Sequence, residues 1–257
     1  MLEFNGRPLL GGKVALITGA GQGMGREIAR GLAQAGASVV VADINKEAVE
    51  DAAAQIRAEG GIAWPVYWNV ANCEEAPRIA DAVQKLAGDI SILVNNAGIH
   101  RRGHIGDAGY ADVLREVMAV NVDGLFHAVS AFLEQLKRTG GNIINLASIQ
   151  SFSAAPNDTT AYAASKGAVA MFTKSLAVEL AKFGIRVNAL APGFIDTPQT
   201  AGSRANPDRV AFVLSHTPMK RIGKAEEMAG PAVFLASPLA EFVNGVVLPV
   251  DGGFLTL

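Results

Sequence analysis

Tyr162 and Lys166 stand four positions apart in a segment whose apolar residues recur at helical spacing up to about Phe183. Side chains four positions apart share one face of a helix, so the phenol and the ammonium are expected to be neighbours. A nearby cation favours the phenolate and lowers the pKa of a tyrosine from about 10 by roughly 1–3 units. The pair is therefore a candidate acid/base unit. The alternative is a packing aromatic beside a solvated charge.

A short apolar run at 14–18 is followed directly by a glycine-rich turn and then by helical spacing. Strand, glycine turn and helix in this order predict a phosphate-binding element. Glycine lets the backbone approach a pyrophosphate, and the helix N-terminus presents free N–H groups. Tight turns also need glycine, so the prediction depends on the flanking strand and helix. The residues expected to contact a dinucleotide here are Gly19, Gln22, Gly23, Met24 and Gly25.

Asp43 ends a second apolar run, 18 residues beyond Gly25. A carboxylate at about this distance accepts hydrogen bonds from the adenosine ribose hydroxyls of NAD and repels the 2′-phosphate of NADP. Neither Gln22 nor Ile44 supplies a cation that would offset the repulsion. NAD is therefore the expected cofactor. Alternatively, Asp43 caps the helix that begins near Lys46.

Apolar runs of strand length alternate with stretches of helical spacing, and no repeat or composition shift marks a domain boundary. Pro65 and Pro249 cannot donate to a sheet ladder, so their strands are expected at the two edges. The pattern predicts one α/β domain over residues 1–257, a Rossmann fold with a doubly wound, seven-stranded parallel sheet in the order 3-2-1-4-5-6-7 and helices on both faces. The predicted strands are 14–18, 38–42, 63–70, 92–94, 143–147, 186–190 and 245–250, and the helices after the first are 46–59, 77–87, 110–137, 162–183 and 224–236.

Polar residues follow two of the predicted strands at their carboxyl ends, where a ligand crevice is expected. Asn95 to Gly98 follow the fourth strand, and Ser148 follows the fifth, far enough before Tyr162 for a loop to return. Polar turns are the alternative for both. Asn121 lies among apolar helix neighbours, where it either braces the backbone or holds a water. The polar stretch 194–219 lacks strong periodicity and is expected to form a substrate lid.

Arg101 and Arg102 lie on the loop that leads out of the same crevice and could pair bidentately with a substrate carboxylate. Alternatively, they are solvated loop charges. The 4 histidines and the single cysteine, Cys73, have no zinc-ligand spacing, so no metal is expected. A net charge of −2 gives no basic field for nucleic acid or an acidic membrane. With no visible secretory signal and no apolar run near 18–20 residues, a soluble cytoplasmic protein is expected.

Together these motifs resemble the short-chain dehydrogenase/reductase family over nearly the whole chain. The matching motifs are the glycine turn from Thr18 to Gly25, Asn95 to Gly98, Asn121, Ser148, Tyr162 with Lys166, Pro192-Gly193 and Thr197. The resemblance implies Asn121, Ser148, Tyr162 and Lys166 as catalytic residues. It implies further cofactor contacts from Asn69, Val70, Asn96, Ala97, Gly98, Pro192, Gly193, Ile195 and Thr197. Asn69 departs from the family's usual Asp, but its carbonyl can still accept from the adenine amino group.

The resemblance also implies a mechanism. Ser148 hydrogen-bonds the substrate oxygen, and Tyr162 takes the hydroxyl proton while hydride passes to NAD. Lys166 lowers the pKa of Tyr162 and binds the nicotinamide ribose, and Asn121 holds a water that connects Lys166 to solvent. Members of the family are commonly homotetramers, and the apolar C-terminal residues 254–257 fit a buried interface.

The segments 95–102, 193–200 and 235–253 resemble members that act on sugar acids and polyols, of the gluconate 5-dehydrogenase and 2-deoxygluconate 3-dehydrogenase type. On this basis Arg101 or Arg102 would bind the carboxylate, and Gln150, Asn157 or Gln199 the hydroxyls. One alternative is a 3-oxoacyl-carrier-protein reductase, which usually prefers NADP and is disfavoured by Asp43. Another is a non-catalytic dinucleotide-binding protein on the same fold, disfavoured by the intact catalytic set.

Overall fold

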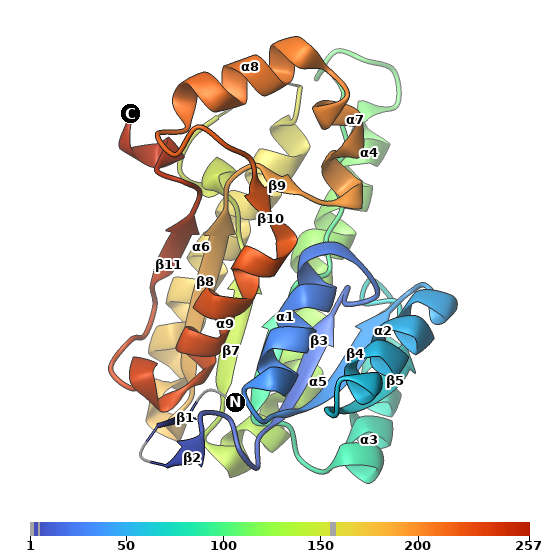
Figure 1. Cartoon of the computed structure of the whole chain (residues 1–257). Helices are drawn as coiled ribbons and strands as arrows, with labels where there is room; N and C mark the ends of the chain where they lie inside the picture. Colours follow the sequence, from blue (N-terminus) through green and yellow to red (C-terminus); the bar gives the residue numbers. More distant parts are fainter. Residues whose placement is uncertain (1–2, 5, 155–157) are drawn as a thin grey trace.

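The computed structural model describes residues 3–4, 6–154 and 158–257 of the chain. Seven parallel strands form the central sheet in the order β11-β8-β7-β6-β3-β4-β5 (Figure 1). Counted along the chain, this order is 3-2-1-4-5-6-7 from β5 to β11, which confirms the predicted Rossmann fold. The strands are β3 (Val14–Thr18), β4 (Ser38–Asp43), β5 (Ile62–Tyr67), β6 (Ile92–Asn95), β7 (Asn142–Leu146), β8 (Arg186–Pro192) and β11 (Val247–Val250).

Pro65 and Pro249 lie in the two edge strands of the sheet, as predicted. Pro65 is in β5, which pairs only with β4, and Pro249 is in β11, which pairs only with β8. Each edge strand has one side without a ladder partner, so the missing proline N–H is tolerated there.

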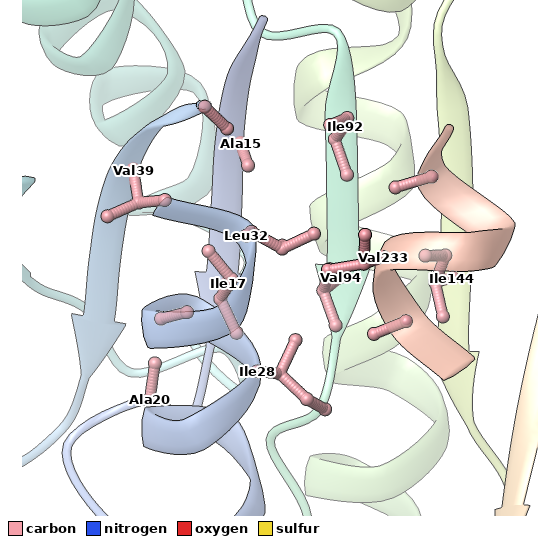
Figure 2. Packing of buried hydrophobic residues seen from close by; sticks show 14 of the residues in the cluster. Ala15, Ile17, Ala20, Ile28, Leu32, Val39, Ile92, Val94, Ile144 and Val233 are labelled. Atoms are coloured by element: carbon pink, nitrogen blue, oxygen red, sulfur yellow. The ribbon is translucent and has the colours of Figure 1, made fainter. Parts of the chain in front are cut away.

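Helices cover both faces of the sheet and enclose two apolar cores. Side chains that alternate along β3 point to opposite faces. Ile17 packs in the core beneath α1 and α9, and Leu16 in the core beneath α3, α5 and α6. Figure 2 shows the first core, where Ile28 and Leu32 of α1 meet strand residues and Val233 of α9. The helices are α1 (Gly23–Gln34), α2 (Lys46–Ala58), α3 (Ala76–Ala87), α4 (Tyr110–Met118), α5 (Gly124–Thr139), α6 (Thr160–Leu180), α7 (Ala201–Arg204), α8 (Pro207–His216) and α9 (Ala229–Ala236).

The helix expected over 110–137 is interrupted by a π-helical turn, η1 (Ala119–Asp123), between α4 and α5. Asn121 sits in this turn, and single π turns inside α-helices often mark functional sites. The run 110–139 is long and apolar enough to cross a membrane by length and composition alone, so the expectation of no such segment is not met. Core helices pass the same test, and Phe132 and Leu136 are buried against the sheet. The run is therefore weak evidence of a membrane span.

The segment 194–219 folds over the carboxyl ends of the central strands, and there the structure adds elements that the sequence did not predict. The strand β9 (Ile195–Asp196) pairs with β10 (Gly223–Lys224), and α7 and α8 follow β9 along the chain (Figure 1). Asn206 caps α8 by accepting from the Arg209 N–H at 3.0 Å. At the N-terminus, β1 (Glu3–Phe4) and β2 (Arg7–Pro8) form a two-stranded hairpin.

Candidate active site

The glycine turn is pinned against the end of β6 by close backbone contact. A Cβ on Gly25 would lie 2.3 Å from Asn96 Nδ2, and one on Gly19 would lie 2.7 Å from the Ala97 Cα. Asn96 Nδ2 donates to the carbonyl oxygens of Thr18 and Gly19 at 2.9 and 2.8 Å. Thr18 Oγ1 in turn accepts from the Asn96 and Ala97 N–H groups. Asn96 therefore fixes the turn, and no larger residue fits at either glycine.

The N-terminus of α1 fits a dinucleotide pyrophosphate. Gln22 precedes the helix without making a side-chain cap, and the first turn holds no acidic residue. Its N–H groups are thus available to an anion, with the positive end of the helix dipole behind them. The turn opens on a cavity of 440 Å³ whose lining includes most predicted cofactor residues: Gly19, Gln22, Gly23, Met24, Gly25, Asp43, Asn69, Val70, Asn96, Ala97, Gly98 and Thr197. We call this space the cofactor cavity.

Asp43 links the glycine turn to the end of β4. Its Oδ2 accepts from the Gly21 N–H at 3.1 Å, and its Oδ1 accepts from the Asn45 N–H at 2.9 Å. Asn45, not Asp43, caps α2 by accepting from the Ala48 N–H. The alternative interpretation of Asp43 as a helix cap is therefore wrong. Its carboxylate lines the cofactor cavity.

Asn69 lies beyond β5 on the same cavity wall. Its Oδ1 accepts from the Ala71 N–H at 3.1 Å and so forms a local turn. A carbonyl oxygen has two lone pairs, so one remains for an adenine amino group. The buried indole of the neighbouring Trp68 also lines this wall.

Ser148, Tyr162 and Lys166 converge at the carboxyl ends of β7 and β8. Ser148 and Tyr162 line the same two cavities, and the Lys166 Nζ lies 5.7 Å from the centre of the Tyr162 ring. The start of α6 is held by α4, because the Tyr110 hydroxyl accepts from the Ala161 N–H at 3.0 Å. The phenol and the ammonium are therefore neighbours, as their spacing predicts.

The pKa values of this cluster are governed by burial. Burial raises the pKa of Tyr162, and the hydrogen bond with Ser148 opposes the rise. Burial lowers the pKa of Lys166 to about 8, while its Nζ donates to the Leu146 carbonyl at 2.6 Å. The expectation that Lys166 holds the Tyr162 pKa below 10 is thus not met, because desolvation of the phenolate is the largest influence on this pKa and raises it.

Asn121 braces the loop that follows β6. Its Oδ1 accepts from the Ile99 N–H at 2.7 Å, and its Nδ2 donates to the Ile99 carbonyl and to Ser165 Oγ at 3.0 and 2.9 Å. A Cβ on Gly98 would lie 3.2 Å from Asn121 Oδ1 and 3.5 Å from Lys166 Nζ. The bracing alternative is therefore the one that this side chain realises, and the water-holding role stays a prediction.

Two smaller cavities continue from the cofactor cavity past the cluster. One, of 80 Å³, is lined by the remaining predicted cofactor residues, Tyr162, Lys166, Pro192, Gly193 and Ile195. Thr197 lines both this cavity and the cofactor cavity. The other, of 100 Å³, lies between Ser148 and Tyr162 and the α7–α8 segment. Gln199 lines all three cavities. Ser148 and Tyr162 therefore stand where cofactor space meets space beneath α7 and α8, which we call the lid cavity.

The predicted substrate residues are only partly brought together. Gln150 and Gln199 line the lid cavity, whereas Asn157 lies outside the described residues. Arg101 lines the cofactor cavity instead and pairs with Glu116 at 2.8 Å. Arg102 donates to Ser203 Oγ at 2.8 Å and lines neither cavity. The structure thus brings neither arginine to the wall beside Ser148.

The lid-cavity residues that sequence reasoning missed include His100, Arg209, Phe212 and Phe254. The His100 ring stands edge-on to Tyr162, with 4.8 Å between the ring centres. Burial lowers the pKa of His100, and Arg102, Arg209 and Arg101 lower it further. Only the helix cap at Asn206 could have signalled α8, and no sequence pattern placed Arg209 beside Ser148. Within the described ranges, no three His, Cys, Asp or Glu side chains form a group that could hold a metal ion.

Comparison with known proteins agrees with this geometry. A family model described as enoyl-(acyl carrier protein) reductase matches residues 19–255. Galactitol 2-dehydrogenase (L-tagatose-forming) of Cereibacter sphaeroides is 42% identical over 95% of this chain and 96% of its own. The chain belongs to the short-chain dehydrogenase/reductase family. It is an oxidoreductase that acts on CH–OH groups with a nicotinamide dinucleotide cofactor, and interconverts a secondary alcohol and a ketone.

Two further relatives are similar over nearly their whole length. The 5-keto-D-gluconate 5-reductase of Escherichia coli K12 is 39% identical over 96% of each chain. The crystal structure of a gluconate 5-dehydrogenase from Burkholderia cenocepacia J2315, in complex with NADP and tartrate, is 39% identical, covers 98% of each chain and superposes with a TM-score of 0.92. The fold and the family are thereby established together.

Proposed function

We propose that this short-chain dehydrogenase/reductase acts on a sugar acid, sugar or polyol, with NAD as its cofactor. The observation that carries the proposal is the position of Ser148 and Tyr162, which both line the lid cavity and the 80 Å³ cavity that continues from the cofactor cavity. Gln150 and Gln199 supply amides to the lid cavity, as hydroxyl-rich substrates require. The names of the galactitol and gluconate relatives support the same substrate class.

In the proposed reaction, Ser148 donates to the substrate oxygen and Tyr162, in its phenolate form, accepts the substrate hydroxyl proton. A bound nicotinamide supplies the hydride acceptor for the carbinol carbon. The ketone leaves with the oxygen that Ser148 had bound. Lys166 is a cation on the cofactor side of Tyr162, and Asn121 positions the backbone of residue 99 beside it. The segment 194–219 acts as the lid that excludes water.

The proposed preference for NAD over NADP depends on Asp43. Its carboxylate faces the cofactor cavity with both oxygens held by backbone N–H groups, which leaves the negative charge in place. A 2′-phosphate placed against it meets like charge. The Burkholderia relative was crystallised with NADP, so the preference is a property to measure on this chain.

The test is reduction of NAD⁺ and of NADP⁺, followed at 340 nm, with matched aldonates, alditols, aldoses and simple secondary alcohols. The expected result is activity on an aldonate or alditol, with a higher kcat/KM for NAD⁺ than for NADP⁺. Silence on the whole panel, together with NADPH-dependent reduction of an acetoacetyl thioester, would overturn both the substrate class and the cofactor preference.

We also propose that the enzyme is a cytoplasmic homotetramer. Met171 and Val178 of α6 and Phe126 of α5 are exposed apolar side chains on long helices, and Phe242 is fully exposed near the C-terminal strand. Apolar surface of this kind is commonly covered by a second subunit. Light scattering coupled to size exclusion gives the subunit number directly, and a monomer at micromolar concentration would contradict the proposal.

A further inference from the structure

The charged side chains in the described lining of the lid cavity are of one sign, positive. Its described lining holds one guanidinium, Arg209, and no carboxylate. Three arginines act on the pKa of His100 in its wall, and each lowers that pKa, as nearby positive charges do. Of the three, Arg101 is neutralised by its ion pair with Glu116 on the cofactor side. Arg209 is therefore the cation that lines the lid cavity, and Arg102 is a second cation that acts on His100 in its wall.

Arg209 is held in place by its helix. It stands in the first turn of α8, where its N–H is capped by Asn206 and its guanidinium carbon lies 5.4 Å from the centre of the Phe212 ring. Burial lowers its pKa, and Arg102 lowers it further. A half-buried cation next to a second cation is stabilised when an anion enters. The planar guanidinium matches a carboxylate through two parallel hydrogen bonds.

We propose that Arg209 binds a carboxylate of the substrate, so that the lid cavity selects a sugar acid over the neutral polyol of the same chain length. This inference rests on the proposed function and narrows its substrate class. Arg209 and the Ser148–Tyr162 pair line the same cavity, so the carboxylate sits on α8 while a carbinol further along the substrate reaches Tyr162. Arg102, whose guanidinium donates to Ser203 Oγ, adds a second positive charge near Arg209.

A carboxylate fits this site better than a phosphate does. The lid cavity measures 100 Å³ and its described lining holds one guanidinium, whose planar pair of N–H donors matches the two oxygens of a carboxylate. A phosphate monoester carries close to two charges near neutral pH and needs a larger set of donors. A neutral alditol leaves the guanidinium with no counter-charge from the substrate. The order expected for kcat/KM is aldonate first, with the alditol and its phosphate well below.

The experiment compares Arg209→Gln and Arg209→Lys with the wild-type enzyme on two matched pairs, D-gluconate with D-glucitol and D-galactonate with galactitol, at saturating cofactor. D-Glucitol 6-phosphate serves as the phosphate probe. The glutamine variant is expected to lose about 10- to 100-fold in kcat/KM on the preferred aldonate, mostly through KM, because a hydrogen-bonded charge pair is removed. The kcat/KM of the glutamine variant on the alditol is expected to change less than about threefold. On the aldonate, the kcat/KM of the lysine variant should fall between those of the wild-type enzyme and the glutamine variant.

Two further arginine variants serve as controls. Arg115→Gln removes an exposed guanidinium that pairs with Asp112 outside the cavities, so it should leave both substrates unaffected. Arg101→Gln acts on the cofactor cavity and should change both members of a pair by the same factor. Thermal unfolding of each variant checks that the fold is intact.

The possible outcomes separate this inference from the proposed function. If Arg209→Gln lowers both members of a pair equally, or leaves the aldonate unchanged, Arg209 does not bind the carboxylate and the proposed function stands without it. Wild-type preference for the alditol or the phosphate also overturns the inference alone. Wild-type silence on every sugar acid and polyol overturns the proposed function and this inference together. A selective loss on the aldonate in both variants confirms that Arg209 binds the carboxylate.

Discussion

The cofactor cavity and the lid cavity share Gln199 and are bridged by the 80 Å³ cavity that Ser148 and Tyr162 line, yet they are built in different ways. The cofactor cavity is formed by backbone: a glycine turn, the free N-terminus of α1 and the strand ends of a parallel sheet. The lid cavity is lined mainly by side chains from at least six separate segments, with α8 supplying its cation. A backbone site tolerates little change in its glycines. A side-chain site can be altered one residue at a time, which is how one fold serves many substrates.

The largest expected effect comes where the two cavities meet. Tyr162→Phe removes the hydroxyl that exchanges the substrate proton and keeps the ring that contacts His100. We expect kcat to fall by about 10³-fold or more, since positioned acid/base groups contribute roughly 10²–10⁴-fold. Cofactor affinity, measured by quenching of protein fluorescence, should stay within a few fold. A loss of cofactor affinity as large as the fall in kcat would mean that Tyr162 contributes to cofactor binding as much as to proton transfer.

Gly25→Ala tests whether the cofactor cavity depends on backbone contact. The added Cβ would lie 2.3 Å from both Asn96 Nδ2 and the Gly19 carbonyl oxygen, so the turn must move. We expect cofactor affinity to fall by about 100-fold, together with a lower thermal midpoint. Gly167→Ala is the matched control, because a Cβ there meets nothing within 4 Å. Equal behaviour of the two variants would show that the turn does not need this close contact.

Burial of Lys166 predicts a rise in stability with pH. Its pKa is about 8 in the folded protein and near 10.5 in the unfolded chain, so the unfolded chain binds more protons between these values. The free energy of unfolding should therefore gain about 2 kcal/mol from this group between about pH 7.5 and pH 9.5. Urea unfolding at fixed protein concentration measures it against Lys166→Met, whose curve should lack this gain. Parallel curves would show that Lys166 is not desolvated.

The smallest predicted effect concerns the choice of cofactor. Asp43→Asn keeps the shape of the side chain and its acceptor oxygen for the Gly21 N–H but removes the charge. The ratio of kcat/KM for NADP⁺ to that for NAD⁺ should rise about tenfold, roughly the 1.4 kcal/mol of one lost like-charge contact. The effect should shrink as salt rises if the phosphate site is open to solvent. An unchanged ratio would show that Asp43 does not set the cofactor preference.

The contrast between the two cavities also explains what the sequence could predict. Strand order, both edge prolines and the glycine turn follow from local patterns, because period, proline chemistry and turn geometry act over a few residues. The Tyr162 and Lys166 pair follows from helical spacing alone. Arg209 could not be predicted in this way, since its place beside Ser148 depends on how α8 packs over the sheet. The raised pKa of Tyr162 also needed the fold, because burial does not follow from spacing.

The most direct test of how the two cavities work together is a crystal structure of the Tyr162→Phe variant with NAD⁺ and the best aldonate bound. We predict the dinucleotide along the glycine turn and Asp43, and the sugar acid in the lid cavity. One substrate hydroxyl should lie about 2.6–3.2 Å from Ser148 Oγ, with its carbon facing the nicotinamide and the ring of residue 162. A sugar acid bound elsewhere, or a hydroxyl turned away from Ser148, would contradict the claim that the two cavities meet at the reacting carbon.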